Sequence, residues 1–120
     1  TAVRPVTDVT HVERAISTMR GIYVAPVIND YIVRLVGSTR NNPELRLGAS
    51  PRACVHLMRA ARVEAALQGR DYVIPEDVAA LAVPVLAHRV LLTVDAQVAR
   101  QSNETVIEHI IATTQPPHRG

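Results

Sequence analysis

Apolar residues recur every three or four positions in five stretches of the chain, which is the spacing of one face of an α-helix. The predicted helices span about residues 8–20, 26–40, 50–68, 75–90 and 102–115. Their apolar stripes are, in order, Val9, Val12, Ile16 and Met19; Ile28, Tyr31, Ile32, Leu35 and Thr39; Cys54, Leu57, Met58, Ala61 and Ala65; Val78, Leu81 and Ala82; and Val106, Ile107, Ile110 and Ile111.

Prolines, glycines and small polar residues mark where these helices start and stop. Ser50 followed by Pro51 predicts a helix start in which the Ser50 side chain is the cap. Gly69 predicts the end of that helix. Pro84 should interrupt the fourth helix, which then resumes for a last turn or two. Ser102 is expected to cap the fifth helix.

The segments between the helices carry weaker signals. Residues 41–50 and the polar stretch after Leu92 are predicted to be loops. Two short β-prone runs, Ile22–Val24 and Tyr72–Ile74, could form one small pairing, although each is too short to make a sheet. The sequence therefore predicts an all-α fold, a small helical bundle with at most one very short strand pair.

The amino-acid composition indicates which residue types fill the core. Hydrophobic residues make up 48% of the 120 residues, but aromatic residues only 2%, with three Tyr and no Phe or Trp. The core must therefore be aliphatic. This argues against RNA-binding sheets and single-strand grooves that stack bases on aromatic rings, and against aromatic cages and membrane-interface belts.

The charge balance is close to neutral. Thirteen basic and eleven acidic residues give a net charge of +2, and the pI of 9.2 is high because every basic residue is Arg. Little titrates between pH 7 and 9 in such a chain, so the pI does not indicate a nucleic-acid-binding protein. The single Cys54 excludes an internal disulfide and suits a reducing cytosol. No segment has the length or pattern of a membrane span or signal peptide.

The start of the third helix is the most informative candidate site. Arg52 stands in its first turn, where exposed amide groups already make a positive end and a cation is unfavourable by about 0.3–1 kcal/mol. An arginine there makes physical sense if an anion binds, because the guanidinium and the amides then point at the same oxygens. The alternatives are a solvated arginine and one paired with a carboxylate. His56 and Arg59 lie on the same face of the predicted helix as Arg52, opposite the core. This stripe is either a solvated face or a binding surface.

Other candidates are weak. Cys54 and His56 stand two apart in a helix and cannot face each other, so they do not form a nucleophile and base. Glu76 and Asp77 could be a general acid pair, but a helix first turn explains them without chemistry. The five histidines lack metal-ligand spacing, so no metal site is expected. The chain shows no complete catalytic machinery.

Three stretches in order carry a family resemblance. They are residues 30–40 (Asp-Tyr-Ile-Val-Arg-Leu-Val to Thr-Arg), 46–53 (Arg-Leu-Gly-Ala-Ser-Pro-Arg-Ala) and 69–78 (Gly-Arg-Asp-Tyr-Val-Ile-Pro-Glu-Asp-Val), followed by Val-Leu-Ala-His-Arg at 85–89. Together they resemble the C-terminal lid domain of MoxR-type AAA+ ATPases over about residues 22–111. The resemblance implies a helical lid over residues 1–115 and a flexible tail over 116–120. It departs at Ala25, where a small polar or acidic cap is expected.

The resemblance implies a role for one arginine. Arg52 matches the sensor 2 residue that reaches the γ-phosphate of ATP, with Ser50 and Pro51 at the helix N-terminus and His56 and Arg59 as flanking candidates. The chain begins with Thr1, and the Walker A, Walker B, sensor 1 and arginine-finger elements are expected upstream of it. ATP and Mg²⁺ are therefore expected in the intact protein, which should be an ATPase, while this chain alone should not hydrolyse ATP or bind nucleotide tightly.

The implied partners are the AAA+ core of the same chain and a homo-oligomeric ring, typically a hexamer, in the cytoplasm. MoxR-type proteins resemble chaperones that assemble or load metal into partner complexes, often alongside proteins with von Willebrand factor A domains. No nucleic acid or membrane partner is expected. Arg40 and His88-Arg89 match the family without an assigned role, so packing or subunit contacts are expected of them.

Two other classes of function stay open. One is a DNA-binding helical module, because residues 72–78 and the helix after them also resemble a histone-fold segment; the acidic residues spread along every segment argue against it. The other is an oligomerisation module without a ligand, which would give Arg52 no role.

Overall fold

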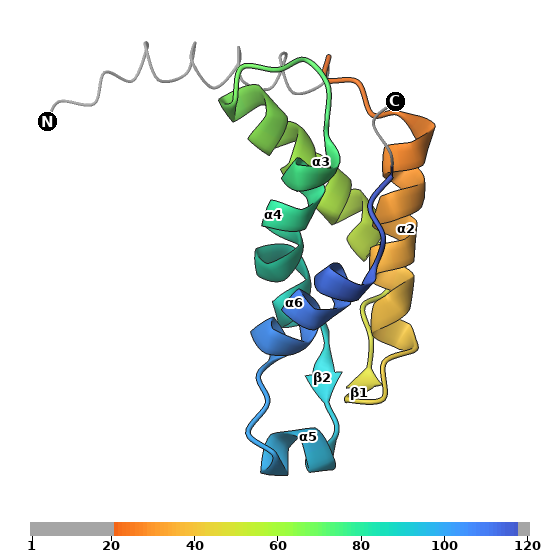
Figure 1. The fold of residues 1–120 in the computed structure, drawn as a ribbon, viewed down its shortest axis with the longest axis vertical. Helices are drawn as coiled ribbons and strands as arrows, with labels where there is room; N and C mark the ends of the chain where they lie inside the picture. Colours follow the sequence, from red (N-terminus) through yellow and green to blue (C-terminus); the bar gives the residue numbers. More distant parts are fainter. Residues whose placement is uncertain (1–20, 118–120) are drawn as a thin grey trace, which may run out of the picture.

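The computed structural model describes residues 21–117, and this part of the chain is mainly helical (Figure 1). Its elements are α2 (Pro26–Arg40), β1 (Leu45–Leu47), α3 (Ala53–Leu67), α4 (Pro75–Leu86), the 3₁₀ turn η1 (Ala87–Arg89), β2 (Leu91–Leu92), α5 (Val94–Val98) and α6 (Asn103–Thr113). The all-α prediction is confirmed. The helix predicted over residues 8–20 lies outside the described residues.

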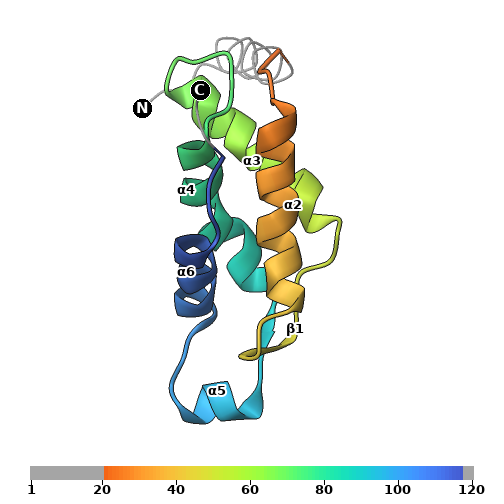
Figure 2. The same ribbon diagram turned by 45° about the vertical axis from the view of Figure 1, so that its right-hand side comes forward.

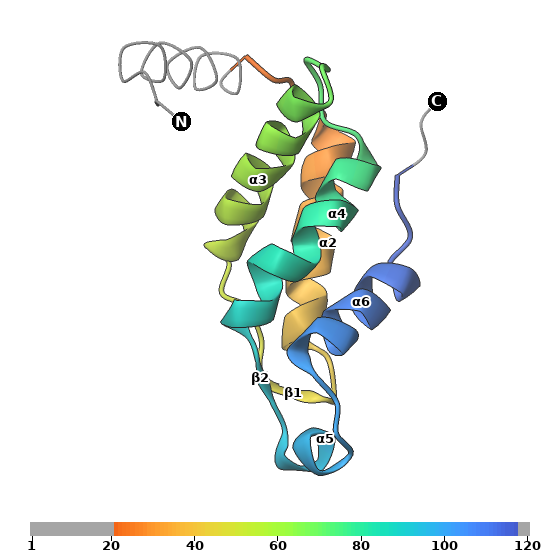
Figure 3. The ribbon, with the colours of Figure 1, turned by 90° about the vertical axis from the view of Figure 1, so that its left-hand side faces the viewer.

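The core is aliphatic apart from Tyr31 and lies between four helices. α3 packs most extensively against α4, while α2 contacts α3 and α4, and α6 contacts α4 and α2 (Figure 3). Of the predicted stripe positions among the described residues, Cys54, Met58, Leu81 and Ile111 are half-buried at the edge of the core, and the others are buried. Within residues 21–117, no helix is both long enough and apolar enough to cross a bilayer.

The predicted stop of α3 and cap of α6 are both confirmed. Gly69 has φ +78°, and its amide and that of Arg70 donate to the carbonyls of Ala66 and Ala65 at 3.0 and 2.9 Å. This pattern closes a helix through a left-handed residue, which glycine adopts without a steric cost. Ser102 Oγ accepts a hydrogen bond from the Thr105 amide at 3.0 Å.

Pro84 does not interrupt α4, so this prediction is wrong. The helix continues through Pro84 to Leu86, and η1 follows directly. A proline in a helix leaves the carbonyl four residues earlier without its usual donor. Here both Pro84 and Ala80 are exposed, so water can reach that carbonyl.

The strand pairing forms at a different place from the one predicted. Ile22–Val24 and Tyr72–Ile74 meet only in an isolated parallel bridge between Tyr23 and Tyr72. The two-stranded sheet is instead antiparallel β1–β2, which pairs Leu45 with Leu92 and Leu47 with Leu91. Strands of two and three residues are too short to show an alternating pattern, so no sequence pattern predicts them.

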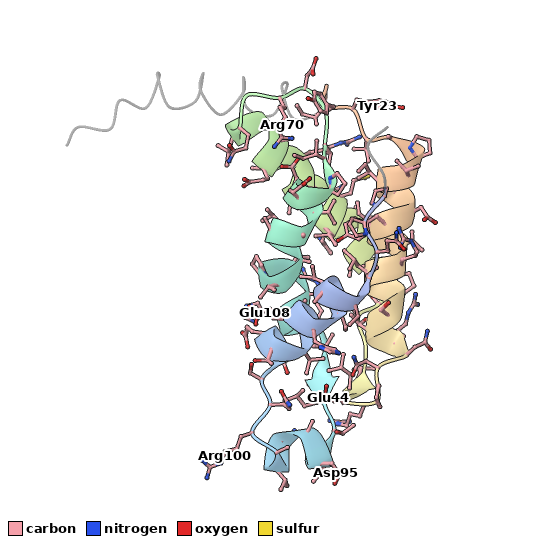
Figure 4. All side chains as sticks on the ribbon, in the orientation of Figure 1. Tyr23, Glu44, Arg70, Asp95, Arg100 and Glu108 are labelled. Atoms are coloured by element: carbon pink, nitrogen blue, oxygen red, sulfur yellow. The ribbon has the colours of Figure 1, made fainter. Side chains whose placement is uncertain are left out.

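The stretch after Leu92, predicted to be a linker, contains α5. The Thr93 hydroxyl accepts from the Ala96 amide at 3.1 Å and caps this short helix, while the Thr93 amide donates to the Glu44 carbonyl at 2.9 Å. α5 therefore stands beyond β1 and β2 at one end of the molecule (Figure 2). Figure 4 shows Glu44, Asp95 and Arg100 toward this end, and Tyr23 and Arg70 at the opposite end.

Candidate functional site

The loop between α2 and α3 is held against the last turn of α2. The Thr39 hydroxyl donates to the Val36 carbonyl at 2.6 Å and accepts from the Ala49 amide at 2.8 Å, and Thr39 and Ala49 are fully buried. Gly48 lies so close to α2 that a Cβ there would meet the Thr39 carbonyl carbon and oxygen at 2.5 Å. The loop that leads to α3 is therefore fixed by one buried hydroxyl and one glycine.

A tight turn over residues 50–52 precedes α3. The amides of Ala53, Cys54 and Val55 donate to the carbonyls of Ser50, Pro51 and Arg52 at 2.9, 3.0 and 3.0 Å. The α-helix begins at Ala53, and Arg52 is its N-cap residue with helical φ and ψ of −61° and −25°. The predicted side-chain cap by Ser50 is wrong, because Ser50 enters this turn through its main-chain carbonyl.

Arg52 and Arg59 are exposed and His56 is half-exposed. Among residues 21–117 the ion pairs are Arg34–Asp30 and Arg70–Asp77, so no described carboxylate pairs with Arg52. One alternative for Arg52, a carboxylate partner, is thereby excluded for this part of the chain. The first three amides of α3 are already bonded, so an anion near Arg52 would be bound chiefly by the guanidinium.

Cys54 follows Arg52 in the first turn of α3 and lies at the edge of the core. Burial raises the pKa of its thiol, and the positive charge of Arg40 partly opposes that rise. A thiol of raised pKa is mainly protonated at neutral pH and is a poor nucleophile. Cys54 lies on the core side of α3 as predicted, but it is half-buried at the core edge rather than fully buried.

Asp77 has a structural role. Its carboxylate accepts two hydrogen bonds of 2.6 Å from the Arg70 guanidinium and one of 2.9 Å from the Ile74 amide, and only 3% of the residue is exposed. The Arg70 pKa is raised, mainly by this bond to Asp77. The oxygens of this buried carboxylate are taken up by three structural hydrogen bonds, which removes the case for an acid pair with Glu76.

The remaining family-like residues, Arg40, His88 and Arg89, are all exposed, and one further side chain that links two elements is not predicted from the sequence. Arg89 donates to the Val85 carbonyl one turn earlier in the chain, and His88 is exposed. Asn103, at the start of α6, donates to the carbonyls of Ala87 and Val90 at 2.7 and 3.2 Å, and so ties α6 to η1. No local pattern marks Asn103. Within residues 21–117 no group of three His, Cys, Asp or Glu could hold a metal ion.

The sequence around this site is similar to that of known proteins. The family described as AAA lid domain matches residues 37–110, which include Thr39, Gly48 and Arg52. The chain is 40% identical over 90 residues to YeaC of Bacillus subtilis (strain 168), covering 75% of this chain and 28% of YeaC. It is 40% identical over 104 residues to Chaperone MoxR1 of Mycobacterium tuberculosis, covering 79% of this chain and 28% of that protein.

A solved structure gives the same answer for the fold. A candidate ATPase of Cytophaga hutchinsonii superposes with a TM-score of 0.79 at 29% identity, over 85% of this chain and 34% of that protein. The chain thus spans about a third or less of the length of each of these relatives. The resemblance carried by the three sequence stretches is confirmed, and the chain belongs to the AAA lid domain family.

Proposed function

We propose that this chain is the lid of a MoxR-type AAA+ ATPase, and that Arg52 is its sensor 2 arginine. In this proposal the Arg52 guanidinium contacts the γ-phosphate of ATP bound in the core of the same protein. The observation that carries the proposal is the position of Arg52. It is an exposed guanidinium without a described carboxylate partner, at the start of a 15-residue helix whose preceding loop is fixed to α2.

The chemistry of this position suits a phosphate. A guanidinium offers planar, paired donors that match phosphate oxygens. Without an anion, a cation at a helix N-terminus is unfavourable, and a phosphate reverses the sign of that interaction. Ser50 and Pro51 form the turn that presents Arg52, and His56 and Arg59 extend positive or polar character along the same helix.

The lid acts by closing on the core. With ATP and Mg²⁺ bound, the contact from Arg52 joins lid and core through the γ-phosphate, and hydrolysis removes it. The lid is then free to swing, and the change passes around a ring of subunits, typically six. The work performed is chaperone-like assembly or metal loading of partner proteins in the cytoplasm, alongside proteins with von Willebrand factor A domains. The relative named Chaperone MoxR1 supports this part of the proposal.

Arg52→Ala in the full-length protein tests the assignment. Turnover of ATP should fall by more than tenfold, because an electrostatic contact to the transferring group is lost. Arg100→Ala is the matched control, since Arg100 is exposed beyond α5 and should leave turnover unchanged. His56→Ala and Arg59→Ala should reduce turnover less than Arg52→Ala. Unchanged turnover in a folded Arg52→Ala protein would refute the sensor 2 role.

A further inference from the structure

Arg34, in the middle of α2, links this helix to the end of the described chain. Its Nη1 donates to the Gln115 carbonyl oxygen at 2.7 Å, across 81 positions of sequence. Its Nε donates to Asp30 Oδ2 at 3.0 Å, one turn earlier on α2. The guanidinium carbon also lies 5.5 Å from the centroid of the Tyr31 ring. One side chain therefore joins three groups, and only one of them, Gln115, is distant in sequence.

The segment that Arg34 holds is extended. α6 ends at Thr113, and Thr114 has extended φ and ψ of −102° and 120°. Pro116 and Pro117 follow, and proline both fixes its own φ and disfavours helical conformation in the residue before it. In Figure 1 this segment leaves α6 and runs beside α2. Residues 114–117 thus form an extended piece whose link to α2 is the bond from Arg34.

The Arg34 guanidinium also covers one side of the buried Tyr31 ring. The Tyr31 residue is only 2% exposed, whereas 38% of the Arg34 side chain is exposed. The Arg34 guanidinium therefore lies between the Gln115 carbonyl on its outer side and the Tyr31 ring on the side of the core. A guanidinium that is bonded on one side and lies over a ring on the other is restrained in place.

We propose that residues 114–117 are a strap that Arg34 fastens to α2, and that releasing this strap loosens the end of α6 and uncovers Tyr31. The strap makes α2 and the end of α6 move as one body while it is fastened. It is a conformational device of the domain itself and does not depend on the role of Arg52. Its release is a local opening, which is expected to leave α3 and α4 folded.

Hydrogen exchange of the 120-residue chain tests the fastening by Arg34. In Arg34→Met, the amides of residues 110–115 should exchange about tenfold faster, while those of α3 and α4 stay as in the parent. Arg89→Met is the matched control, because Arg89 also donates to a main-chain carbonyl, but one four residues away, at Val85. It should leave exchange at residues 110–115 unchanged. Unchanged exchange in Arg34→Met, or a uniform rise over all helices, would overturn the proposal.

A second experiment tests the strap without altering Arg34. With Tyr23→Phe and Tyr72→Phe, Tyr31 becomes the single Tyr, and it can be excited selectively because the chain contains no Trp and Phe absorbs at shorter wavelengths. Deleting residues 114–120 in this background should make Tyr31 fluorescence more accessible to acrylamide quenching, with helix content retained in circular dichroism. Deletion of residues 118–120 alone is the control and should leave quenching unchanged. Equal quenching in the two deletion proteins would overturn the proposal.

Discussion

The hydroxyl of Thr39 joins the end of α2 to Ala49 in the loop before α3. It accepts from the Ala49 amide at 2.8 Å and donates to the Val36 carbonyl at 2.6 Å, so both kinds of hydrogen bond available to a hydroxyl are used. Both Thr39 and Ala49 are fully buried. Arg52 follows Ala49 by three residues, so this contact fixes the base from which Arg52 projects.

Thr39→Val should therefore destabilise the domain. Valine keeps the shape of threonine but leaves the Ala49 amide unpaired in the core, which costs about 1–3 kcal/mol. The free energy of unfolding can be measured by urea denaturation. Thr113→Val is the control: that hydroxyl bonds carbonyls on the exposed side of α6, and its loss should cost about 0.5 kcal/mol or less. Equal losses in the two variants would contradict the anchoring role of Thr39.

Gly48→Ala tests the close approach of the same loop to α2. The new Cβ would lie 2.5 Å from the Thr39 carbonyl atoms, and these belong to helix backbone that cannot turn aside. Overpacking of this kind costs about 1–3 kcal/mol of unfolding free energy. Gly37→Ala is the control, because Gly37 lies inside α2 with nothing within 4 Å of a new Cβ. It should stabilise by about 0.5–1 kcal/mol. Stabilisation by Gly48→Ala would show that the loop is free to move.

The sequence predicts those elements that bury a periodic stripe. Leu35, Leu57 and Ile107 are fully buried, as their spacing requires, because a helix at the surface of a core must repeat its apolar residues every turn. The place of Arg52 at a helix start also follows from local residues. The sequence wrongly predicts how Ser50 bonds at this helix start. Either a main-chain carbonyl or a side-chain oxygen can accept from the free amides of a first turn, and Ser50 uses its carbonyl.

The sequence does not reveal contacts that depend on distant residues. β1 and β2 are short and stable only through pairing between residues more than forty positions apart. α5 has five residues, fewer than a periodic pattern needs. The sequence predicts Thr39 on the apolar stripe of its helix, but the bond between its hydroxyl and the Ala49 amide depends on how the loop folds back. These features depend on tertiary contacts, so local sequence patterns do not predict them.

Asp77→Asn tests the buried pair between Asp77 and Arg70. The substitution keeps the size of the side chain but leaves Arg70, which is 21% exposed, without its counter-charge. Breaking a buried pair costs about 3–5 kcal/mol, and the partial exposure of Arg70 favours the low end of about 3. Asp30→Asn is the control, because its pair with Arg34 is exposed and should contribute less than about 1 kcal/mol. Thermal or urea unfolding of both variants gives the comparison, and similar losses would contradict a structural role for Asp77.

Arg100→Gly should stabilise the domain. Arg100 has φ 63°, and its amide and that of Gln101 close α5 by donating to the carbonyls of Gln97 and Ala96. Glycine is the residue usually found in this conformation, in which a Cβ costs about 1–2 kcal/mol. The greater freedom of glycine in the unfolded chain offsets part of this gain, which leaves about 0.5–1 kcal/mol in urea denaturation. Arg100→Ala keeps the Cβ and should give no gain, so equal stabilisation by both would refute this explanation.

The phenol of Tyr31 should make stability depend on pH in the alkaline range. Its pKa is raised above 10.0, chiefly by burial, with the charge of Arg34 opposing the rise and that of Glu76 adding to it. The folded state thus favours the neutral phenol more than the unfolded state does. Below pH 10 this contribution to stability is fully present, and it is lost as the pH rises through the folded-state pKa. Urea denaturation from pH 9 upward should therefore show a steeper fall in unfolding free energy for the parent than for Tyr31→Phe. Parallel curves for the two proteins would mean that Tyr31 ionises equally easily in both states.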